Sequence, residues 1–249
     1  MEIAAQLYTV RKFTGTEADV LQTFRKIKSM GYDSVQISAF GFYEPERIRE
    51  MLDETGLSVC ATHTPFDRIT GDTDKVIAEH KLFGCKYVGL GWMRADDIEG
   101  YRALLDKLAP AVAKIADAGL KFVYHNHNHE FRKFDGVRPI DFMLENTDSR
   151  FGFLADFYWV QTAGCSPVSF IEKFADRLDV VHFKDKRVPP EGKTDMAEIF
   201  EGNMDYEAIY RACLKAGVSY AAVEQDECDG DPFDSLALSR RNIKARLGI

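Results

Sequence analysis

Short apolar segments recur eight times along this chain, and amphipathic segments separate them. The starts of the apolar segments lie about 25 to 40 residues apart. Regular alternation of strand and helix is what a parallel sheet with crossover helices requires. The predicted strands are Ile3–Tyr8, Ser34–Ser38, Ser58–Thr62, Tyr87–Leu90, Lys121–His127, Gly152–Phe157, Val180–Lys184 and Tyr220–Gln225.

Between the predicted strands, several segments have the apolar periodicity of surface helices. Clear examples are Glu17–Met30, Glu46–Thr55, Asp97–Ala118, Tyr206–Ala216 and Phe233–Leu247. A glycine follows four helices, where a left-handed residue commonly ends a helix. These glycines are Gly31, Gly56, Gly119 and Gly217.

Eight strand and helix units in 249 residues have the size of a closed (β/α)8 barrel. The main rival is an open, doubly wound sheet, which would bind a nucleotide at a glycine-rich first turn. The segment Tyr8–Phe13 after the first strand has no such glycines, and the chain has no Walker loop. We therefore predict an α/β fold, a TIM barrel with a single domain over residues 1–249. Lys186–Asp195 is expected to form a loop and part of a lid.

Composition restricts the partners of the chain. It has 32 Lys and Arg against 40 Asp and Glu, a net charge of −8, which disfavours nucleic acid because duplexes are bound through their phosphates. No segment approaches the roughly 18 apolar residues of a membrane span. The first residues lack the features of a signal peptide, and the five cysteines form no C-x-x-C pair. We expect a cytoplasmic protein with reduced thiols, no membrane partner and a small-molecule ligand.

Polar residues follow four consecutive predicted strands. In a TIM barrel, this carboxyl end of the strands carries the active site. The polar runs are His125–Glu130, Asp156–Trp159, His182–Asp185 and Glu224–Asp226. Clustering of this kind predicts a functional site at one end of the barrel.

Alternate residues of a strand share one face, which pairs Leu154 with Asp156 and His182 with Lys184. On the last strand, Ala222, Glu224 and Asp226 share a face. On the fifth strand the even-numbered set ending in Glu130 alternates with three histidines. Parity leaves that strand undecided, because regular geometry could end by Asn128.

Glu130, Asp156, His182 and Glu224 would together offer three carboxylates and one imidazole. Oxygen ligands with a single nitrogen suit Mn²⁺ first, or Mg²⁺, and less exclusively Co²⁺ or Zn²⁺. Three converging anions repel one another unless a cation or shared protons compensate. The alternatives are solvated loop acids for the two glutamates, a buried core histidine, and a helix cap for Asp156.

Other polar and aromatic residues near the strand ends are candidate substrate contacts. Lys184 shares a face with His182 and could reach a substrate oxygen, or form a surface ion pair. His63 ends the third strand and could bind a hydroxyl group, or remain an ordinary loop histidine. Trp92 could line the cavity. The run His125, His127, His129 is expected to form hydrogen bonds within the barrel wall, and only His127 is taken as a substrate contact or as a support for a metal ligand.

Motifs at the strand ends resemble the xylose isomerase-like barrel superfamily, in the branch of sugar phosphate isomerases and epimerases. The resemblance covers residues 3 to about 226. Its motifs are Gln6-Leu7-Tyr8-Thr9, Tyr124-His125-Asn126-His127 with Glu130-Phe131, Asp156-Phe157-Tyr158-Trp159-Val160, Ala163-Gly164, His182-Phe183-Lys184-Asp185, Gly202-Asn203-Met204-Asp205-Tyr206 and Val223-Glu224-Gln225-Asp226.

The resemblance implies one divalent metal held by Glu130, Asp156, His182 and Glu224, with the two glutamates as the proton-transfer pair. Related epimerases have a histidine where this chain has Trp159, which could instead stack on a sugar face. We expect an isomerase or epimerase of a carbonyl-bearing sugar that removes the proton beside the carbonyl.

Three alternatives to this function stay open. The same site could serve a dehydratase, or a lyase of inosose or 3-keto-glycoside type. The barrel could also bind sugar or metal without catalysis. Endonuclease IV-like repair would need more metal ligands and a basic surface. Related barrels often pair, so a homo-oligomer is also open.

Overall fold

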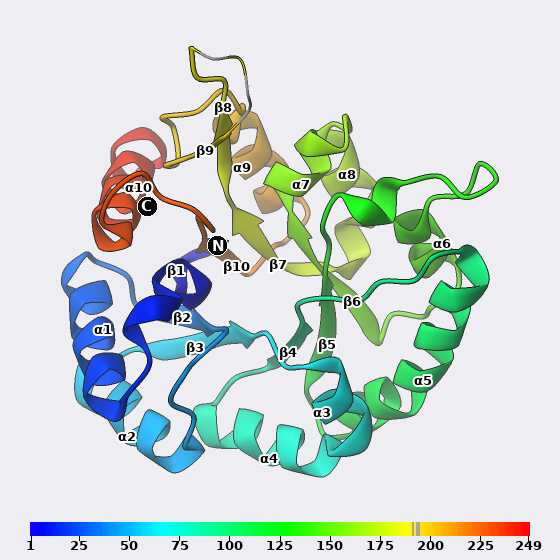
Figure 1. Ribbon diagram of the computed structural model, residues 1–249, viewed down its shortest axis with the longest axis horizontal. Helices are drawn as coiled ribbons and strands as arrows, with labels where there is room; N and C mark the ends of the chain where they lie inside the picture. Colours follow the sequence, from blue (N-terminus) through cyan, green and yellow to red (C-terminus); the bar gives the residue numbers. More distant parts are fainter. Residues whose placement is uncertain (191, 193–194) are drawn as a thin grey trace.

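Eight parallel strands surround one axis in the computed structural model, which describes residues 1–190, 192 and 195–249 (Figure 1). The strands are β1 (Glu2–Gln6), β2 (Ser34–Ile37), β3 (Ser58–Thr62), β4 (Tyr87–Leu90), β5 (Lys121–His125), β6 (Phe151–Asp156), β7 (Leu178–Phe183) and β10 (Tyr220–Val223). They pair in the order β3-β2-β1-β10-β7-β6-β5-β4. The backbone N–H of Thr64 donates to the carbonyl of Gly89 at 2.7 Å and joins β3 to β4. The predicted TIM barrel is confirmed.

Helices cover the outside of the barrel (Figure 1). They are α1 (Glu17–Ser29), α2 (Pro45–Thr55), α3 (Phe66–Gly71), α4 (Thr73–Phe83), α5 (Ile98–Asp117), α6 (Pro139–Glu145), α7 (Phe157–Thr162), α8 (Pro167–Phe174), α9 (Tyr206–Lys215) and α10 (Pro232–Leu247), with 3-10 turns η1 (Leu7–Phe13), η2 (His129–Phe131) and η3 (Ala175–Arg177). The five predicted helices begin and end within one residue of these bounds. The four predicted cap glycines all have positive φ.

A short hairpin follows β7. Asp185–Arg187 (β8) pairs antiparallel with Asp195–Ala197 (β9). The predicted loop Lys186–Asp195 thus contains parts of two strands. Its interpretation as a lid also involves residues 191, 193 and 194, which lie outside the described residues.

Small and apolar side chains fill the centre of the barrel. They come from seven of the strands, and they are Ala4, Cys60, Ala61, Tyr87, Val123, Leu154, Val180 and Ala222. A larger apolar cluster lies between the strands and the helices. On six of the strands, a polar side chain lies two residues after a central position: Gln6, His63, His125, Asp156, His182 and Glu224. This polar layer is the base of the functional site.

The fifth strand ends at His125, two residues earlier than predicted. The cause is Asn126, whose buried side chain takes over the pairing with β6. Its Oδ1 accepts a hydrogen bond from the backbone N–H of Asp156 at 3.0 Å, and its Nδ2 donates to the carbonyl of Asp156 at 3.4 Å. The backbone beyond His125 is therefore free to turn away from the sheet.

All five cysteines are unpaired, in agreement with the predicted reduced thiols. Within the described part of the chain, we find no helix with both the length and the apolar character needed to cross a membrane.

Closure of the barrel predicts that Gly89 tolerates no side chain. A Cβ atom there would lie 2.0 Å from the carbonyl oxygen of Thr62, which is backbone and cannot rotate away. Gly89→Ala should lower the free energy of unfolding by about 1–3 kcal/mol, as overpacking does. The matched control is Gly71→Ala, where a Cβ would meet nothing within 4 Å. Urea denaturation of both variants tests this, and equal stability of the two would contradict it.

Candidate functional site

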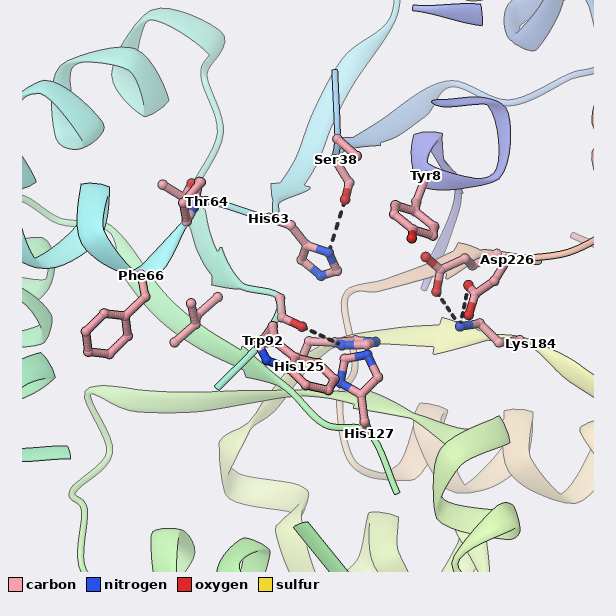
Figure 2. A pocket seen from close by; sticks show the side chains of 15 residues that line it. Tyr8, Ser38, His63, Thr64, Phe66, Trp92, His125, His127, Lys184 and Asp226 are labelled. Atoms are coloured by element: carbon pink, nitrogen blue, oxygen red, sulfur yellow. Dashed lines mark hydrogen bonds and ion pairs between the residues drawn. The ribbon is translucent and has the colours of Figure 1, made fainter. Parts of the chain in front are cut away.

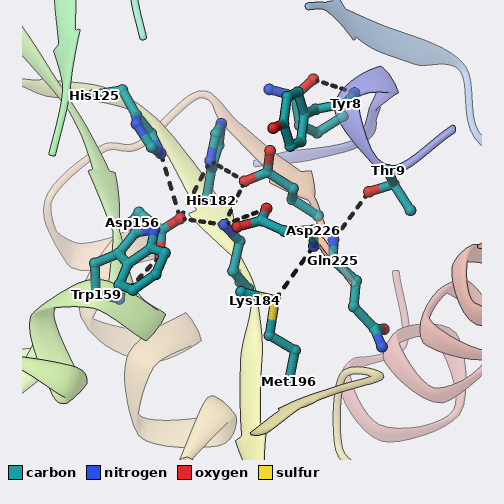
Figure 3. Close-up of polar contacts among 12 residues, drawn as sticks. Tyr8, Thr9, His125, Asp156, Trp159, His182, Lys184, Met196, Gln225 and Asp226 are labelled. Carbon is teal, nitrogen blue, oxygen red and sulfur yellow. Dashed lines mark hydrogen bonds and ion pairs between the residues drawn. The ribbon is translucent and has the colours of Figure 1, made fainter. Parts of the chain in front are cut away.

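Four side chains converge where β5, β6, β7 and β10 reach the mouth of the barrel (Figure 3). His125, Asp156, His182 and Glu224 are all buried, and one ligand atom from each lies within 4.8 Å of the others. Each follows a central apolar residue by two positions, so strand periodicity points all four toward the barrel axis. We call these four residues the donor group.

Glu130 was expected in this group, and the structure places it elsewhere. Its buried carboxylate accepts hydrogen bonds from the Tyr124 hydroxyl and from the backbone N–H of His127 at 2.9 Å. His129 Nε2 lies 3.1 Å from Oε1, the oxygen that also accepts from Tyr124. The physical reason is the early end of β5, since the chain turns into η2 and carries Glu130 behind the strand end. His125 stands where the fourth ligand was expected.

Lys184 supplies a buried positive charge beside the donor group. Its Nζ lies 3.0 Å from Asp156 Oδ2, 2.8 Å from Glu224 Oε2 and 2.9 Å from Asp226 Oδ1 (Figure 3). The side chain is only 1% exposed. The surface ion pair that the sequence left open is thereby replaced by a buried one.

Charges in this cluster oppose the effect of burial. Burial alone would raise the pKa of Asp156 and of Glu224, but the Lys184 ammonium and the neighbouring histidines hold both pKa values well below their usual range. Burial would lower the pKa of Lys184, and the facing carboxylates raise it well above normal. The cluster is therefore ionised at neutral pH.

Hydrogen bonds on the outer ring nitrogens orient both imidazoles of the donor group. His182 Nε2 lies 2.8 Å from Gln36 Oε1, and His125 Nδ1 lies 3.4 Å from the carbonyl oxygen of Gly91. Both partners are acceptors, so these nitrogens carry the hydrogen. The inner nitrogens, His182 Nδ1 and His125 Nε2, face the carboxylates, where each can donate a hydrogen when protonated or offer a lone pair to a bound cation.

The inner atoms of the donor group suit a bound cation. His182 Nδ1 and Glu224 Oε2 are 2.9 Å apart, and the Lys184 ammonium lies 2.8 Å from the same oxygen. Two lone pairs this close repel unless a proton or a metal ion lies between them. Two imidazole nitrogens and two carboxylates are an ordinary donor set for a divalent transition metal.

A cavity of about 480 Å³ opens above the donor group (Figure 2). Four of the five residues predicted to contact substrate line it: His63, His127, Lys184 and Trp92. Trp92 is 53% exposed and stands at its rim. Burial lowers the pKa of His127 to about 2, so its ring is neutral at physiological pH.

Trp159, the fifth predicted contact, is not among the residues that line the cavity. Its ring packs 5.6 Å from the ring of His127 and 5.5 Å from Lys184 Nζ. It therefore supports two lining residues from behind. Asp156 also caps α7, the alternative role that its sequence position left open, because its Oδ1 accepts a hydrogen bond from the N–H of Trp159 at 3.2 Å.

Sequence reasoning missed three residues of the site. His125 was assigned to the barrel wall, although it follows the apolar Val123 by two positions; that parity would have identified it once Val123 was known to face inward. Asp226 shares a face with Glu224 and lines the cavity. Gln36 left no signal, because its role depends on His182, which is 146 residues away.

Comparison with known proteins places the fold in a described family. The family model for the xylose isomerase-like TIM barrel matches residues 24–241. Inosose dehydratase from Clostridium beijerinckii is 25% identical over 222 residues, which cover 81% of this chain and 69% of the relative.

Two crystal structures have similar folds. A sugar phosphate isomerase/epimerase from Parabacteroides distasonis superimposes with a TM-score of 0.82 at 23% identity, over 97% of each chain. The 3-keto-D-glucoside 4-epimerase of E. coli has a TM-score of 0.70 at 18% identity, over 97% of this chain and 99% of the other. At these identities the two structures support the fold.

Because His125 lies in the donor group and Glu130 does not, we expect substitutions of these two residues to affect metal binding differently. Purified protein reloaded with Mn²⁺ should hold about one ion per chain, and His125→Ala and Asp156→Asn should each weaken binding by more than the roughly 10–100-fold typical of a lost supporting contact. Glu130→Gln is the matched control and should keep the ion, because Glu130 lies outside the donor group. Elemental analysis and calorimetric titration measure both. Loss of the ion in Glu130→Gln and its retention in His125→Ala would restore the ligand set expected from the sequence.

Proposed function

The chain belongs to the xylose isomerase-like TIM barrel family, and on this premise we propose that it is an isomerase or epimerase of a carbonyl-bearing sugar or sugar derivative. The reaction begins with removal of the proton next to the carbonyl and passes through an enediolate. Similarity to an inosose dehydratase and the shared fold with a 3-keto-D-glucoside 4-epimerase support a small carbohydrate as substrate.

The proposal depends on one observation. A group of ionised carboxylates, two oriented imidazoles and a buried ammonium forms the base of a cavity of about 480 Å³. Buried charges are costly unless they are paired, and their concentration beside a cavity is typical of a catalytic centre.

Bound by His125, Asp156, His182 and Glu224, a divalent metal would supply a Lewis acid that polarises the carbonyl and makes the neighbouring proton easier to remove. Two of these four proposed ligands are imidazoles, where the sequence predicted one. Mg²⁺ prefers oxygen ligands, so this set favours Mn²⁺, Co²⁺ or Zn²⁺.

Glu224 is the proposed base. It lines the cavity, and its low pKa keeps it ionised and able to accept a proton. Lys184 is proposed to bind a substrate oxygen, since this residue also lines the cavity. Glu130, predicted as the second base, is not a lining residue. We propose instead that its hydrogen bond to the N–H of His127 positions that side chain.

Placement of Glu130 affects which reaction fits best. Transfer of a proton between neighbouring carbons on one face of the sugar needs a single base, which Glu224 provides. Epimerisation needs a second group on the opposite face. Another residue that lines the cavity, such as His63, His127 or Trp92, would have to supply it (Figure 2).

A dehydratase is the second candidate, and Asp226 favours it. Its carboxylate lies 2.9 Å from Lys184 Nζ and lines the cavity. Burial and the neighbouring Glu224 raise the pKa of Asp226, which increases the protonated fraction that an acid catalyst needs. Asp226 could then protonate a departing hydroxyl group after Glu224 removes the proton.

Solvent exchange tests the shared first step. Protein loaded with Mn²⁺ and incubated in heavy water with a panel of ketoses and keto-inositols should replace the hydrogen beside the carbonyl with deuterium, observed by proton NMR. Glu224→Gln should slow exchange by about 10²–10⁴-fold, the usual contribution of a general base. Glu172→Gln, on the exposed side of α8, should match the wild type.

The products separate the two candidates. An isomer or epimer of unchanged mass supports the first, and a product that has lost water supports the dehydratase. If no carbonyl sugar exchanges its proton although the metal is bound, the enzymatic proposal is wrong and a non-catalytic sugar-binding barrel replaces it.

A further inference from the structure

Two histidines at the base of the cavity are held by two neighbouring glutamines. Gln6 on β1 and Gln36 on β2 pair directly across the two strands, and both are fully buried. Gln36 contacts His182, and Gln6 contacts His63. The two imidazole rings are 5.5 Å apart, centre to centre. The two contacts differ in the amide atom that faces the ring, which is Oε1 in Gln36 and Nε2 in Gln6.

The amide of Gln6 has a fixed orientation. Its Oε1 accepts a hydrogen bond from the backbone N–H of Tyr8 at 3.0 Å, so its Nε2 must face the other way. That nitrogen lies 3.5 Å from His63 Nδ1. An amide nitrogen can only donate, so this contact favours the tautomer in which His63 Nδ1 accepts. The hydroxyl of Ser38, 3.2 Å from the same Nδ1, can rotate to donate as well.

His63 consequently carries its hydrogen on Nε2. This atom is buried and has no hydrogen-bond partner in the described part of the chain. Gly91 leaves the space that the ring occupies, because a Cβ there would lie 2.9 Å from His63 Nδ1. A buried N–H without a partner is costly, and next to a cavity it needs an acceptor from a ligand.

The short distances between His63 and two histidines of the donor group would by themselves suggest that His63 is a metal ligand. One nitrogen of His63 lies within 4.8 Å of ligand atoms of His125 and His182, as in a site with three imidazole ligands. A metal needs a lone pair, however, and Gln6 occupies the lone pair of His63. In His182 the contact with Gln36 Oε1 has the opposite effect and leaves a lone pair facing the donor group.

We propose that Gln6 is a positioning residue that fixes His63 as an N–H donor to a substrate oxygen and keeps it out of the metal ligand set. This inference rests on the proposed function for its substrate, a carbonyl sugar whose oxygen gains negative charge as the neighbouring proton leaves. A fixed donor aimed at such an oxygen stabilises the transition state. His63 lines the cavity that would hold the substrate (Figure 2).

Nitrogen NMR of the histidine rings tests the tautomer without any substrate. In ¹⁵N-labelled wild type, the His63 signals, assigned by their loss in His63→Gln, should show an unprotonated Nδ1 and a protonated Nε2. Addition of Zn²⁺ should shift the inner nitrogens of His125 and His182 and leave the protonation pattern of His63 unchanged. A protonated Nδ1 in His63, or Zn²⁺ bound to its Nε2, would overturn the proposal.

Two substitutions at Gln6 separate positioning from packing. Gln6→Glu replaces the donor with an acceptor, so the hydrogen of His63 should move to Nδ1 and Zn²⁺ affinity should rise. Gln6→Met removes the donor at similar size and should leave a mixture of both tautomers. If both variants fold and the His63 signals stay unchanged, Gln6 acts only through packing and the proposal is wrong.

Activity provides the second readout. In the exchange assay, His63→Gln and Gln6→Glu should each lower kcat by about 10²–10³-fold, the usual effect of losing one such donor. Wild-type kcat in His63→Gln would overturn the donor role. Absence of exchange in the wild type would instead reject the proposed function, and the NMR result on the tautomer would still stand.

Discussion

The contact of Lys184 with three carboxylates is the interaction on which the site depends. Without it, Asp156, Glu224 and Asp226 would repel one another in a buried space, at a cost of several kcal/mol per unpaired ion. The strand end that carries Lys184 is itself firmly held. Its backbone N–H donates to the Tyr206 hydroxyl at 2.7 Å, and the next residue, Asp185, accepts hydrogen bonds from the backbone N–H groups of Lys186, Phe200, Gly202 and Met204. One strand end therefore neutralises the site on its inner side and anchors the following loop on its outer side.

A metal ion bound by the donor group would contact the same carboxylate oxygen atoms as the Lys184 ammonium. Asp156 Oδ2 lies 3.0 Å from Lys184 Nζ, 3.3 Å from His125 Nε2 and 3.6 Å from His182 Nδ1. Any cation bound by the donor group must compete with the ammonium for this oxygen and for Glu224 Oε2. Asp226 is the partner of Lys184 that the donor group does not use. That third carboxylate lets the ammonium stay in the cavity, where a substrate oxygen can reach it.

Much of this arrangement could be predicted from the sequence, because it follows from periodicity. Alternation of strands and helices specified the barrel, and polar residues at the strand ends located Asp156, His182 and Glu224. The inward-facing residues of the fifth strand were harder to predict, because the run His125–Glu130 places polar side chains on both faces. Asn126 ends the strand there by pairing its side chain with the backbone of Asp156, a contact between residues 30 positions apart. The orientations of Gln6 and Gln36 also depend on long-range contacts, and sequence periodicity contains no information about them.

The donor group contains His125 in the place where the sequence predicted Glu130. This difference changes the charge of the site as well as its ligands. With three glutamate and aspartate ligands, the group would carry three negative charges, one more than a divalent ion neutralises. With His125 in place, Asp156 and Glu224 carry two, and Lys184 with Asp226 adds no net charge. Glu130 is instead stabilised behind the strand by the N–H of His127 and by His129. A divalent cation would therefore leave the donor group neutral, so that His63 and Lys184 become the groups that oppose negative charge developing on the substrate.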